Sequence, residues 1–578
     1  MLSLSASSWL GLQVIGSGIL LAQTHAYPSS PFPTVTLSNG PNSTAFIGRF
    51  LPEFDQELFL GIKYADKPTR FTRSALKSVY ASNDSDSGPI RRSSPLGAVH
   101  YNASQYGYEC PGYGSDTTTL LEMGLIELNE DCLNLNVVRP VKTDEDDELL
   151  PVLVWIFGGG WQQGATGDPR YNMTYITRQA ALNGKPILSV SINYRLAAFG
   201  FLDSEEIRAS GNNNLGLLDQ RVAMHWIKKN IEAFGGDPDR ITIWGESAGA
   251  YSVGAHLVAN DGDNEGLFRA AIMDSGNAVG PPWNGTDWHQ PLYDRIVERA
   301  GCSNSPDTLQ CLRDVPFDSL YAVAFENSEW FAAIDGTFIK EYPQISTVDG
   351  RIAKVPILIG SNTDEGVSFG TTGVDTDEDC IAQLISSKRW VLTTSQAAEL
   401  ITYYPDDPVG SPYGWGNVTW PDNGLMYKRY SSMAGDITMA APRRLLAQTM
   451  AKYGQPVHSY RWDVAALNQS SSIGVAHFAE IPFVFANPVQ NITALGSDPA
   501  RLELANLAAR MWASFVADLD PNGHSVPGIP QWPQYTTNTS SSPDSPSNFV
   551  FRLPREDSYV ERDDYRVEGM AYLNTIAR

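Results

Sequence analysis

Five short runs of apolar, mostly β-branched residues recur along the chain, and each ends in a loop that leads toward a helix-like stretch. The runs are "LPVLVWIFGGG" (150–160), "PILSVSINYRL" (186–196), "RITIWGESAG" (240–249), "RAAIMDSGN" (269–277) and "VPILIGSN" (355–362). Strands that are apolar on both faces belong to a sheet covered by helices on both sides. The alternation therefore predicts an α/β fold with a large, mostly parallel central sheet.

The segments around these runs complete the expected architecture. Residues 213–236 carry apolar positions at helical spacing and end in glycines, which predicts an amphipathic helix. Residues 44–65 look like a hairpin and predict an antiparallel edge to the sheet. Polar stretches at 82–97, 143–150 and 536–548 are predicted to be surface loops. With no internal repeat and no long linker, we expect one large domain over residues 27–578 with long insertions.

The charge balance restricts the partners. With 65 acidic and 41 basic residues, the net charge is −24. This charge disfavours nucleic acid and anionic membrane surfaces as partners. Its simplest role is solubility, although an acidic surface would also attract a cationic substrate.

The first 26 residues contain no Asp, Glu, Lys or Arg, and their apolar centre from Trp9 to Ala22 is short and rich in Gly and Ser. Together with small residues before Tyr27, this predicts a secretory signal peptide over residues 1–26. No later stretch approaches 18 uncharged apolar residues, so no integral membrane segment is expected in the mature chain. The prediction is a secreted, extracellular protein.

Glycosylation sequons and cysteines agree with secretion. Nine N-x-[ST] sequons occur, at Asn42, Asn83, Asn102, Asn172, Asn284, Asn417, Asn468, Asn491 and Asn538. Five cysteines in an oxidising compartment suggest two disulfides and one leftover thiol. Pairing between cysteines close in sequence would leave Cys380 free.

The segment "RITIWGESAGAYSVG" (240–254) places Ser247 where a strand ending near Trp244 hands over to a helix beginning near Ala248. This is the context of a nucleophile elbow, in which the serine occupies a strained turn with its hydroxyl exposed. The alternative is an ordinary serine between glycines that ease a strand-to-helix crossing.

The glycine run in "VWIFGGGWQQG" (154–164) follows a buried strand one β-α-β step before Ser247. Backbone N–H groups without side chains are able to point at the oxyanion that forms when a serine attacks a carbonyl. Each such donor contributes about 3 kcal/mol in the transition state. A flexible glycine loop is the alternative.

With these motifs, the chain resembles the type-B carboxylesterase/lipase family of α/β-hydrolases. The matching blocks, in family order, are "EDCLNLNVVRP" (130–140), "VWIFGGGW" (154–161), "INYRLAAFGFL" (192–202), "NNLGLLDQR" (213–221), "FGGDPDRITIWGESAG" (234–249), "DGTFI" (335–339), "GSNTDEG" (360–366) and "VAHFAEIPFVF" (475–485). The resemblance implies an α/β-hydrolase fold with helices on both faces of the sheet, and a serine esterase or lipase activity.

The resemblance also assigns roles by position. It makes Ser247 the nucleophile, Glu365 in "TDEG" the acid and His477 in "VAHFAEIPF" the base. The oxyanion hole is assigned to Gly159, Gly160 and Ala248, and polar residues near the histidine to Glu246 and Ser275. The implied disulfides are Cys110–Cys132 and Cys302–Cys311, and the implied ion pairs are Arg70–Glu130 and Arg195–Asp219.

The residues alone do not decide all of these roles. The order Ser, acid, His allows five histidines after Ser247: His256, His289, His458, His477 and His524. His256 lies in the helix that leaves the turn, His458 in an alternating strand pattern, and His524 in a turn-rich segment. His477, in a loop before an apolar run, is favoured. Between Asp364 and Glu365 only the resemblance chooses.

In the expected mechanism, His477 takes the proton of Ser247, Glu365 holds the imidazole, and an acyl-serine forms and is hydrolysed. These steps require no metal ion and no organic cofactor.

The loop between the first two cysteines, residues 111–131, covers the active-site gorge in the family. Here it carries an apolar run from Leu120 to Leu128, which suits a flap over an acyl chain or a helix packed on the body. It lacks the tryptophan with which cholinesterases bind a quaternary ammonium, so neutral carboxylic esters or acylglycerols are favoured over choline esters. Four aromatic residues are candidates for the pocket wall or for the core: Trp161, Trp283, Trp330 and Phe331.

Two rival functions remain. One is a cholinesterase-like enzyme. The other is a non-catalytic adhesion or binding protein on the same fold, as some members of the family are. Such members lose triad residues, whereas this chain keeps Ser247, Glu365 and His477.

Overall fold

The computed structural model describes residues 32–39, 42–81, 84, 99–141, 148–324, 330–387, 390–406, 418–488, 495–537 and 546–576. The predicted signal peptide and most of the three polar stretches lie outside these ranges, as do the sequons at Asn83, Asn417, Asn491 and Asn538. Leu150, at the end of the second polar stretch, begins a strand instead.

In the described residues, eleven strands form one sheet in the order β14-β13-β12-β11-β10-β9-β7-β8-β6-β4-β3. Their bounds are β3 (Arg49–Leu51), β4 (Gln56–Lys63), β6 (Asn134–Pro140), β7 (Leu150–Ile156), β8 (Leu188–Ile192), β9 (Gly236–Glu246), β10 (Ala270–Asp274), β11 (Ile357–Asn362), β12 (Val457–Trp462), β13 (Ser547–Phe551) and β14 (Tyr559–Arg562). The strands from β8 to β13 pair in parallel, and antiparallel pairs close both edges. The predicted parallel sheet is confirmed. Of the hairpin expected at 44–65, residues 49–63 form an antiparallel pair at the sheet edge, whereas residues 44–47 belong to a separate small sheet.

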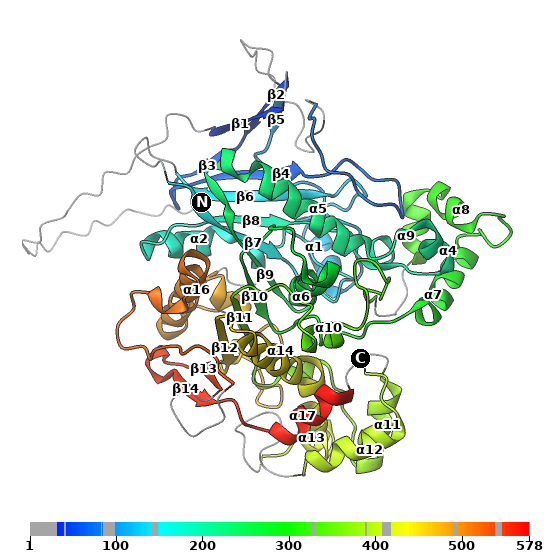
Figure 1. The fold of residues 1–578 in the computed structure, drawn as a ribbon, viewed down its shortest axis with the longest axis vertical. Coiled ribbons are helices and arrows are strands. Elements are labelled where there is room, and N and C mark those ends of the chain that lie inside the picture. The colour runs from blue at the N-terminus through cyan, green and yellow to red at the C-terminus, as the bar shows by residue number, and fades with distance from the viewer. Residues whose placement is uncertain are drawn as a thin grey trace, which may run out of the picture.

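Helices cover both sides of this sheet (Figure 1). α2 (Met173–Leu182) and α16 (Pro499–Asp518) pack together on one side, whereas α5 (Leu215–Asn230) and α6 (Ala248–Gly262) lie on the other. The predicted helix at 213–236 is shorter in the structure. A 3-10 turn at Ile231–Phe234 follows α5, and Gly235 ends it in a left-handed conformation with φ 89°.

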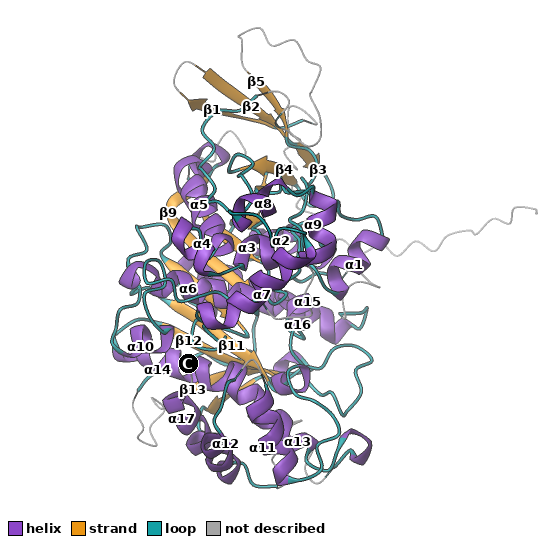
Figure 2. Cartoon of the chain, turned by 90° about the vertical axis from the view of Figure 1, so that its right-hand side faces the viewer, coloured by secondary structure: helices purple, strands orange, loops and turns teal. Residues whose placement is uncertain are grey.

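Two smaller groups of elements lie at the two ends of the molecule. β1 (Thr34–Asn39), β2 (Asn42–Ile47) and β5 (Val99–Asn102) form a small separate sheet. At the opposite end, a second apolar cluster joins four helices: α11 (Asp377–Ser386), α12 (Thr394–Leu400), α13 (Tyr427–Gly435) and α17 (Val567–Ile576). Figure 2 shows these helices below the main sheet. Cys380, the free cysteine, is fully buried in this second cluster.

The other helices connect or extend these layers. They are α1 (Ser115–Glu122), α3 (Ala197–Phe201), α4 (Glu205–Ser210), α7 (Thr286–Arg299), α8 (Thr308–Asp314), α9 (Phe317–Ala324), α10 (Pro343–Val348), α14 (Ala441–Lys452) and α15 (Ile481–Val484).

The strand order decides where the predicted site residues meet. β7, β9, β10, β11 and β12 are consecutive neighbours in the sheet. The carboxyl ends of parallel strands meet at one edge of a sheet, where ligands bind in open α/β folds. The glycine run, Ser247, Ser275, Glu365 and His477 each follow one of these five strands, so the topology brings them to one edge.

Candidate active site

Ser247 occupies a strained turn between β9 and α6. Its φ of 55° and ψ of −124° lie outside the regions that non-glycine residues favour. Its N–H donates to the Asp274 carbonyl at 3.0 Å, and its carbonyl accepts from Tyr251 N at 2.8 Å. The side chain is half-buried. The strand-turn-helix geometry expected of a nucleophile elbow is therefore present.

The two glycines of "GESAG" are required by close packing. A Cβ on Gly249 would lie 2.0 Å from the Ile156 carbonyl oxygen, and one on Gly245 would lie 2.3 Å from the Gly249 carbonyl carbon. Any side chain at either position would push the first turn of α6 away from β7 and β9. The two glycines therefore allow the turn of Ser247 to pack closely against β7 and β9.

The glycine run after β7 lies against this turn. A Cβ on Gly158 would come within 3.0 Å of Ser247 Cβ, so the two segments are in contact. Gly159 and Gly160 have φ of 90° and 67°, which glycine alone adopts readily. Within the described part of the chain, the amides of Gly159, Gly160 and Ala248 donate no hydrogen bond. Three backbone donors beside the serine are therefore free to bind an oxyanion.

Glu365 and His477 form a close pair at the same edge. Glu365 Oε2 lies 2.7 Å from His477 Nδ1. The other carboxylate oxygen, Oε1, accepts from Ser275 Oγ at 2.5 Å and from Asn362 N at 2.7 Å. Since Glu365 is only 2% exposed, these bonds fix its orientation in a dry environment. Ser275, which was expected near the histidine, is linked to His477 by way of the Glu365 carboxylate, which binds both residues.

The structure distinguishes the two adjacent acids that the residue pattern left open. Asp364 Oδ2 accepts from Val475 N at 2.8 Å and thereby holds the loop that carries His477. The Glu365 side chain contacts the imidazole itself.

The far side of the imidazole faces the residue that precedes the serine. His477 Nε2 lies 3.2 Å from Glu246 Oε1. Burial raises the pKa of the Glu246 carboxyl well above its ordinary value, and the nearby Glu365 and Asp274 raise it further. Among the described residues, Ser247 Oγ and His477 share no hydrogen bond. Such bonds are often long before substrate binds and shorten in the reacting complex.

Two buried carboxyls near the site were not predicted. Asp274 accepts from Trp244 Nε1 at 2.6 Å and from Tyr460 Oη at 2.8 Å, and burial raises its pKa to about 7. Glu480 accepts from Asn362 Nδ2 at 2.6 Å, and burial also raises its pKa well above the ordinary value. A glutamate inside the otherwise apolar "FAEIPFVF" is the sequence signal that would have found Glu480.

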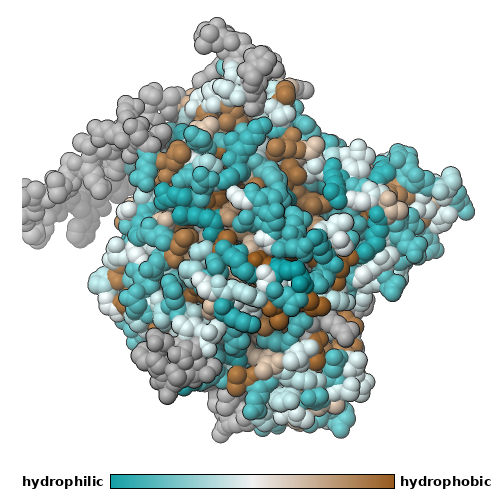
Figure 3. All heavy atoms as spheres, in the orientation of Figure 1, coloured by the Kyte–Doolittle hydropathy of each residue, from teal (hydrophilic) through white to brown (hydrophobic). Residues whose placement is uncertain are grey.

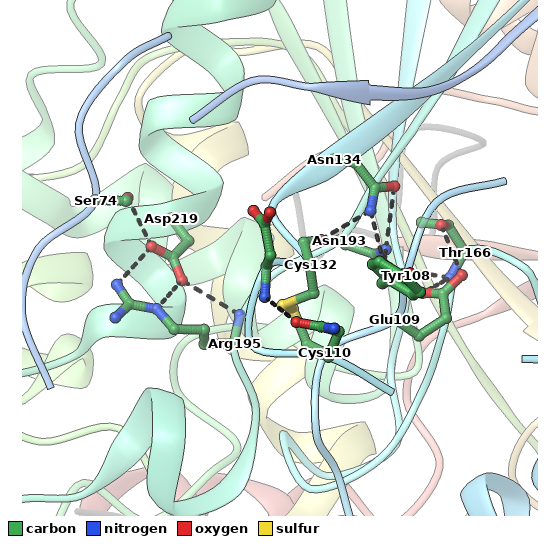
Figure 4. The surroundings of a disulfide bond; sticks show 12 residues. Ser74, Tyr108, Glu109, Cys110, Cys132, Asn134, Thr166, Asn193, Arg195 and Asp219 are labelled. Atoms are coloured by element: carbon green, nitrogen blue, oxygen red, sulfur yellow. Dashed lines mark hydrogen bonds and ion pairs between the residues drawn. A yellow bond between two sulfur atoms is a disulfide. The ribbon is translucent and has the colours of Figure 1, made fainter. Parts of the chain in front are cut away.

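The covalent and ionic links implied by the resemblance are present. Cys110–Cys132 and Cys302–Cys311 are disulfides. Arg70 pairs with Glu130, and Arg195 pairs with Asp219, in both cases at 2.6 Å. Figure 4 shows the first disulfide with the Arg195–Asp219 pair on one side and Glu109 on the other.

Glu109 joins the first disulfide to the loop that follows the glycine run. It accepts from Gly167 N at 2.7 Å and from Thr166 N at 3.1 Å. Burial raises its pKa to about 7.

The predicted flap is partly exposed. α1 buries Leu120, whereas Leu121, Met123 and Leu125 are 40%, 53% and 42% exposed. The four aromatic residues considered for the pocket wall or the core are all buried. The ring centroids of Trp161 and Trp283 lie 6.3 Å apart.

Comparisons with known proteins find similar chains over most of the sequence. The sequence model described as "Carboxylesterase family" matches residues 48–545. "Lipase 2" of Diutina rugosa is 31% identical over 582 residues, covering 94% of this chain and 96% of that protein. "Secreted triacylglycerol lipase LIP1" of Gibberella zeae is 32% identical over 463 residues, covering 77% and 74%. The crystal structure of Aspergillus niger EstA is similar with a TM-score of 0.76 and 27% identity, covering 94% and 98%.

Among the described residues, no helix is both long enough and apolar enough to span a bilayer.

Proposed function

The chain belongs to the carboxylesterase family, and on that premise we propose that it is a secreted enzyme that cleaves neutral esters or acylglycerols through an acyl-serine at Ser247. The family and its lipase relatives make it a carboxylic ester hydrolase. The observation that carries the finer proposal is the 2.7 Å pair of Glu365 and His477 beside the strained turn of Ser247.

Acylation begins with proton transfer. His477 Nε2 accepts the proton of Ser247 Oγ while that oxygen attacks the carbonyl carbon of the ester. Glu365 accepts the hydrogen bond from Nδ1–H, which keeps Nε2 free as the base and stabilises the imidazolium. The carboxylate keeps this position because Ser275 and Asn362 bind its other oxygen.

The tetrahedral intermediate places its negative oxygen among the amides of Gly159, Gly160 and Ala248. The imidazolium then returns the proton to the leaving alcohol, the carbon–oxygen bond of the ester breaks, and the acyl group remains on Ser247. In deacylation, His477 takes a proton from water, the resulting hydroxide attacks the acyl-serine, and the acid leaves as Ser247 regains its proton.

Acylglycerols are the favoured substrate class. The exposed apolar residues Leu121, Met123 and Leu125 suit contact with acyl chains or with a lipid surface. The Gibberella zeae relative is named a secreted triacylglycerol lipase. Secretion is supported by that name, by the uncharged first 26 residues with their apolar centre and by the two disulfides.

The rivals find less support. A cholinesterase-like enzyme would be expected to carry a tryptophan in loop 111–131 for the quaternary ammonium, and this loop has none. A binding protein on this fold would have no use for Ser247, Glu365 and His477 together.

The test combines labelling with substitution. We expect a fluorophosphonate to modify one residue, Ser247, located by peptide mass analysis, and to abolish hydrolysis of 4-nitrophenyl esters. Ser247→Ala should lower kcat by at least about 10³-fold, and Ser514→Ala, a buried serine in α16, should not. Labelling at another residue, or unchanged turnover in Ser247→Ala, contradicts the proposal. Rates from acetate to oleate esters, in solution and as emulsions, then rank the substrates.

A further inference from the structure

Ser252, one turn into α6, connects three groups through its hydroxyl. Its Oγ accepts from Trp161 Nε1 at 2.9 Å and from Gln220 Nε2 at 3.0 Å. It donates to the Ala248 carbonyl at 2.9 Å. A serine hydroxyl has one donor and two acceptor positions, so every position is used. Ser252 is fully buried, which makes each of these bonds costly to lose.

The direction of the hydrogen bonds in this network is set by the Ala248 carbonyl, which can only accept, so that Ser252 must accept from Gln220. Because Gln220 Nε2 donates to Ser252, its Oε1 is left to accept from His256 Nε2 at 3.0 Å. Burial, with Arg221 adding to it, lowers the pKa of His256 far below its ordinary value. The imidazole therefore stays neutral, and because Gln220 Oε1 can only accept, its proton lies on Nε2, so the hydrogen bonds run from His256 through Gln220 to Ser252.

Trp161 is the residue through which this network contacts the glycine run. It directly follows Gly160 and has φ of 59°, a left-handed conformation that is unfavourable for a large side chain. Its indole stacks on Phe201 at 5.1 Å, and its carbonyl accepts from Ala197 N at 2.7 Å. The bond to Ser252 fixes the indole from the side of α6.

We propose that Ser252 is a positioning residue that holds the two halves of the oxyanion hole at a fixed spacing. One half is Gly159–Gly160, held through the indole of Trp161, and the other is Ala248, held through its carbonyl. This proposal rests on the proposed function, since it requires an oxyanion at Ser247. Trp161 and Ser252 are 91 residues apart, and this hydrogen bond joins the loop after β7 to the helix after β9.

The consequence for catalysis follows from geometry. Hydrogen-bond donors stabilise a developing oxyanion only when they lie close to the position that it will occupy. A shift of about 1 Å in a positioned group is able to cost about 10²-fold in rate. Loosening the hole should lower kcat and leave KM nearly unchanged, because the ground-state ester depends little on these donors.

Two substitutions test the link from its two ends. Ser252→Ala removes the shared acceptor, and Trp161→Phe keeps an aromatic ring while removing Nε1–H. We expect each to lower kcat about 10-fold on a 4-nitrophenyl ester, with KM within about twofold of wild type. An alkyl trifluoromethyl ketone adds Ser247 Oγ to its carbonyl, so its oxyanion occupies the hole. Its inhibition constant should rise by the same factor. The double variant should lose less than the product of the two single losses.

Ser514→Ala is the matched control. Ser514 is a fully buried serine in α16, and its Oγ accepts from Asn183 Nδ2 at 3.1 Å. The Ser514→Ala variant should lose thermal stability, as Ser252→Ala does. Its kcat and its inhibition constant for the ketone should stay at the wild-type values. All rates are normalised to active sites titrated with the fluorophosphonate.

The inference is overturned if Ser252→Ala and Trp161→Phe leave kcat and ketone affinity at wild-type values. If Ser252→Ala does not fold, Trp161→Phe alone decides by the same criterion. The proposed function would instead be overturned if the wild-type enzyme did not bind the ketone and the Ser247→Ala variant kept its activity.

Discussion

Buried carboxyls surround the turn of Ser247, and each has a different set of partners. Glu365 binds the imidazole of His477, and Asp364 binds the backbone of the same loop. Asp274 accepts from the indoles of Trp244 and Trp512 and from the phenol of Tyr460. Residues of one chemical type therefore have roles that depend on the groups they contact.

The pair of adjacent acids offers a matched comparison. Glu365→Gln keeps the shape of the side chain but removes the charge that stabilises the imidazolium, so we expect kcat to fall by about 10³- to 10⁴-fold. Asp364→Asn keeps an acceptor for Val475 N and should leave kcat within about 10-fold of wild type. Steady-state rates on a soluble ester measure both. Equal losses in the two variants would show that Glu365 has no special role.

Asp274 should make stability depend on pH. Its pKa is about 7 in the folded chain and 3.8 ordinarily, so the folded state binds more protons between these values. The contribution of Asp274 to the free energy of unfolding is fully present below about pH 4 and is lost as pH rises through 7. Between pH 5 and pH 7 the free energy of unfolding should fall by about 2 kcal/mol. In a chain of this size, that corresponds to about 2 °C in Tm.

Asp274→Asn removes this titration. The Tm of the variant relative to wild type should therefore rise from pH 5 to pH 7 and level off above pH 7, because all other groups titrate alike in both proteins. Thermal unfolding at four pH values measures the difference. A difference that stays constant across this range would refute the assignment.

At the scale of elements, the loop between Cys110 and Cys132 combines a fixed base with an apolar tip. The disulfide closes the base, and Tyr113 Oη donates to the Tyr321 carbonyl of α9 at 2.7 Å. Leu121, Met123 and Leu125 are exposed on the tip. An element with this distribution is suited to contact lipid without rearranging its attachment to the body.

Replacing all three apolar residues of the tip by glutamine tests this role. Contact with a lipid surface removes apolar area from water at about 25 cal/mol per Å², so hydrolysis of emulsified triolein should fall about 10-fold. Hydrolysis of dissolved 4-nitrophenyl butyrate should stay within about twofold of wild type. Leu182→Gln, at a still more exposed leucine at the end of α2, is the control and should change neither rate. Equal losses on both substrates would argue against a lipid contact.

At the scale of the whole molecule, the net charge of −24 acts at a distance. The face shown in Figure 3 is mostly hydrophilic, with apolar residues scattered in small groups. Such a surface favours solubility and repels anionic interfaces. Screening by salt weakens this repulsion, because the Debye length falls from about 30 Å at 0.01 M to about 3 Å at 1 M.

This charge predicts a salt-dependent preference among emulsions. Triolein droplets coated with anionic phospholipid should be hydrolysed several-fold more slowly than droplets coated with zwitterionic phospholipid at 0.01 M salt. The difference should disappear by about 0.5 M salt. The rate on a soluble ester at both salt concentrations is the control. A preference that persists at high salt would point to specific headgroup contacts rather than net charge.

The sequence by itself determined the layers and the order of the elements. The five apolar runs became β7 to β11, because a strand buried on both faces has no polar alternation and is recognisable locally. The glycines around Ser247 and in the run at 158–160 were also visible, since close backbone approach tolerates only glycine.

Tertiary structure alone decided which polar atoms meet. Asp364 and Glu365 are neighbours in one turn, and which of them contacts His477 depends on how the chain bends after β11. Asp274 and Glu480 became buried carboxyls only when β12 and the loop after it packed beside β11, which brought Tyr460 to Asp274 and Glu480 to Asn362. The bond between Trp161 and Ser252 likewise spans two neighbouring strands and the helix that follows one of them. Local patterns encode periodicity and backbone freedom, whereas hydrogen bonds of a few ångströms between distant residues depend on the packing of the whole sheet.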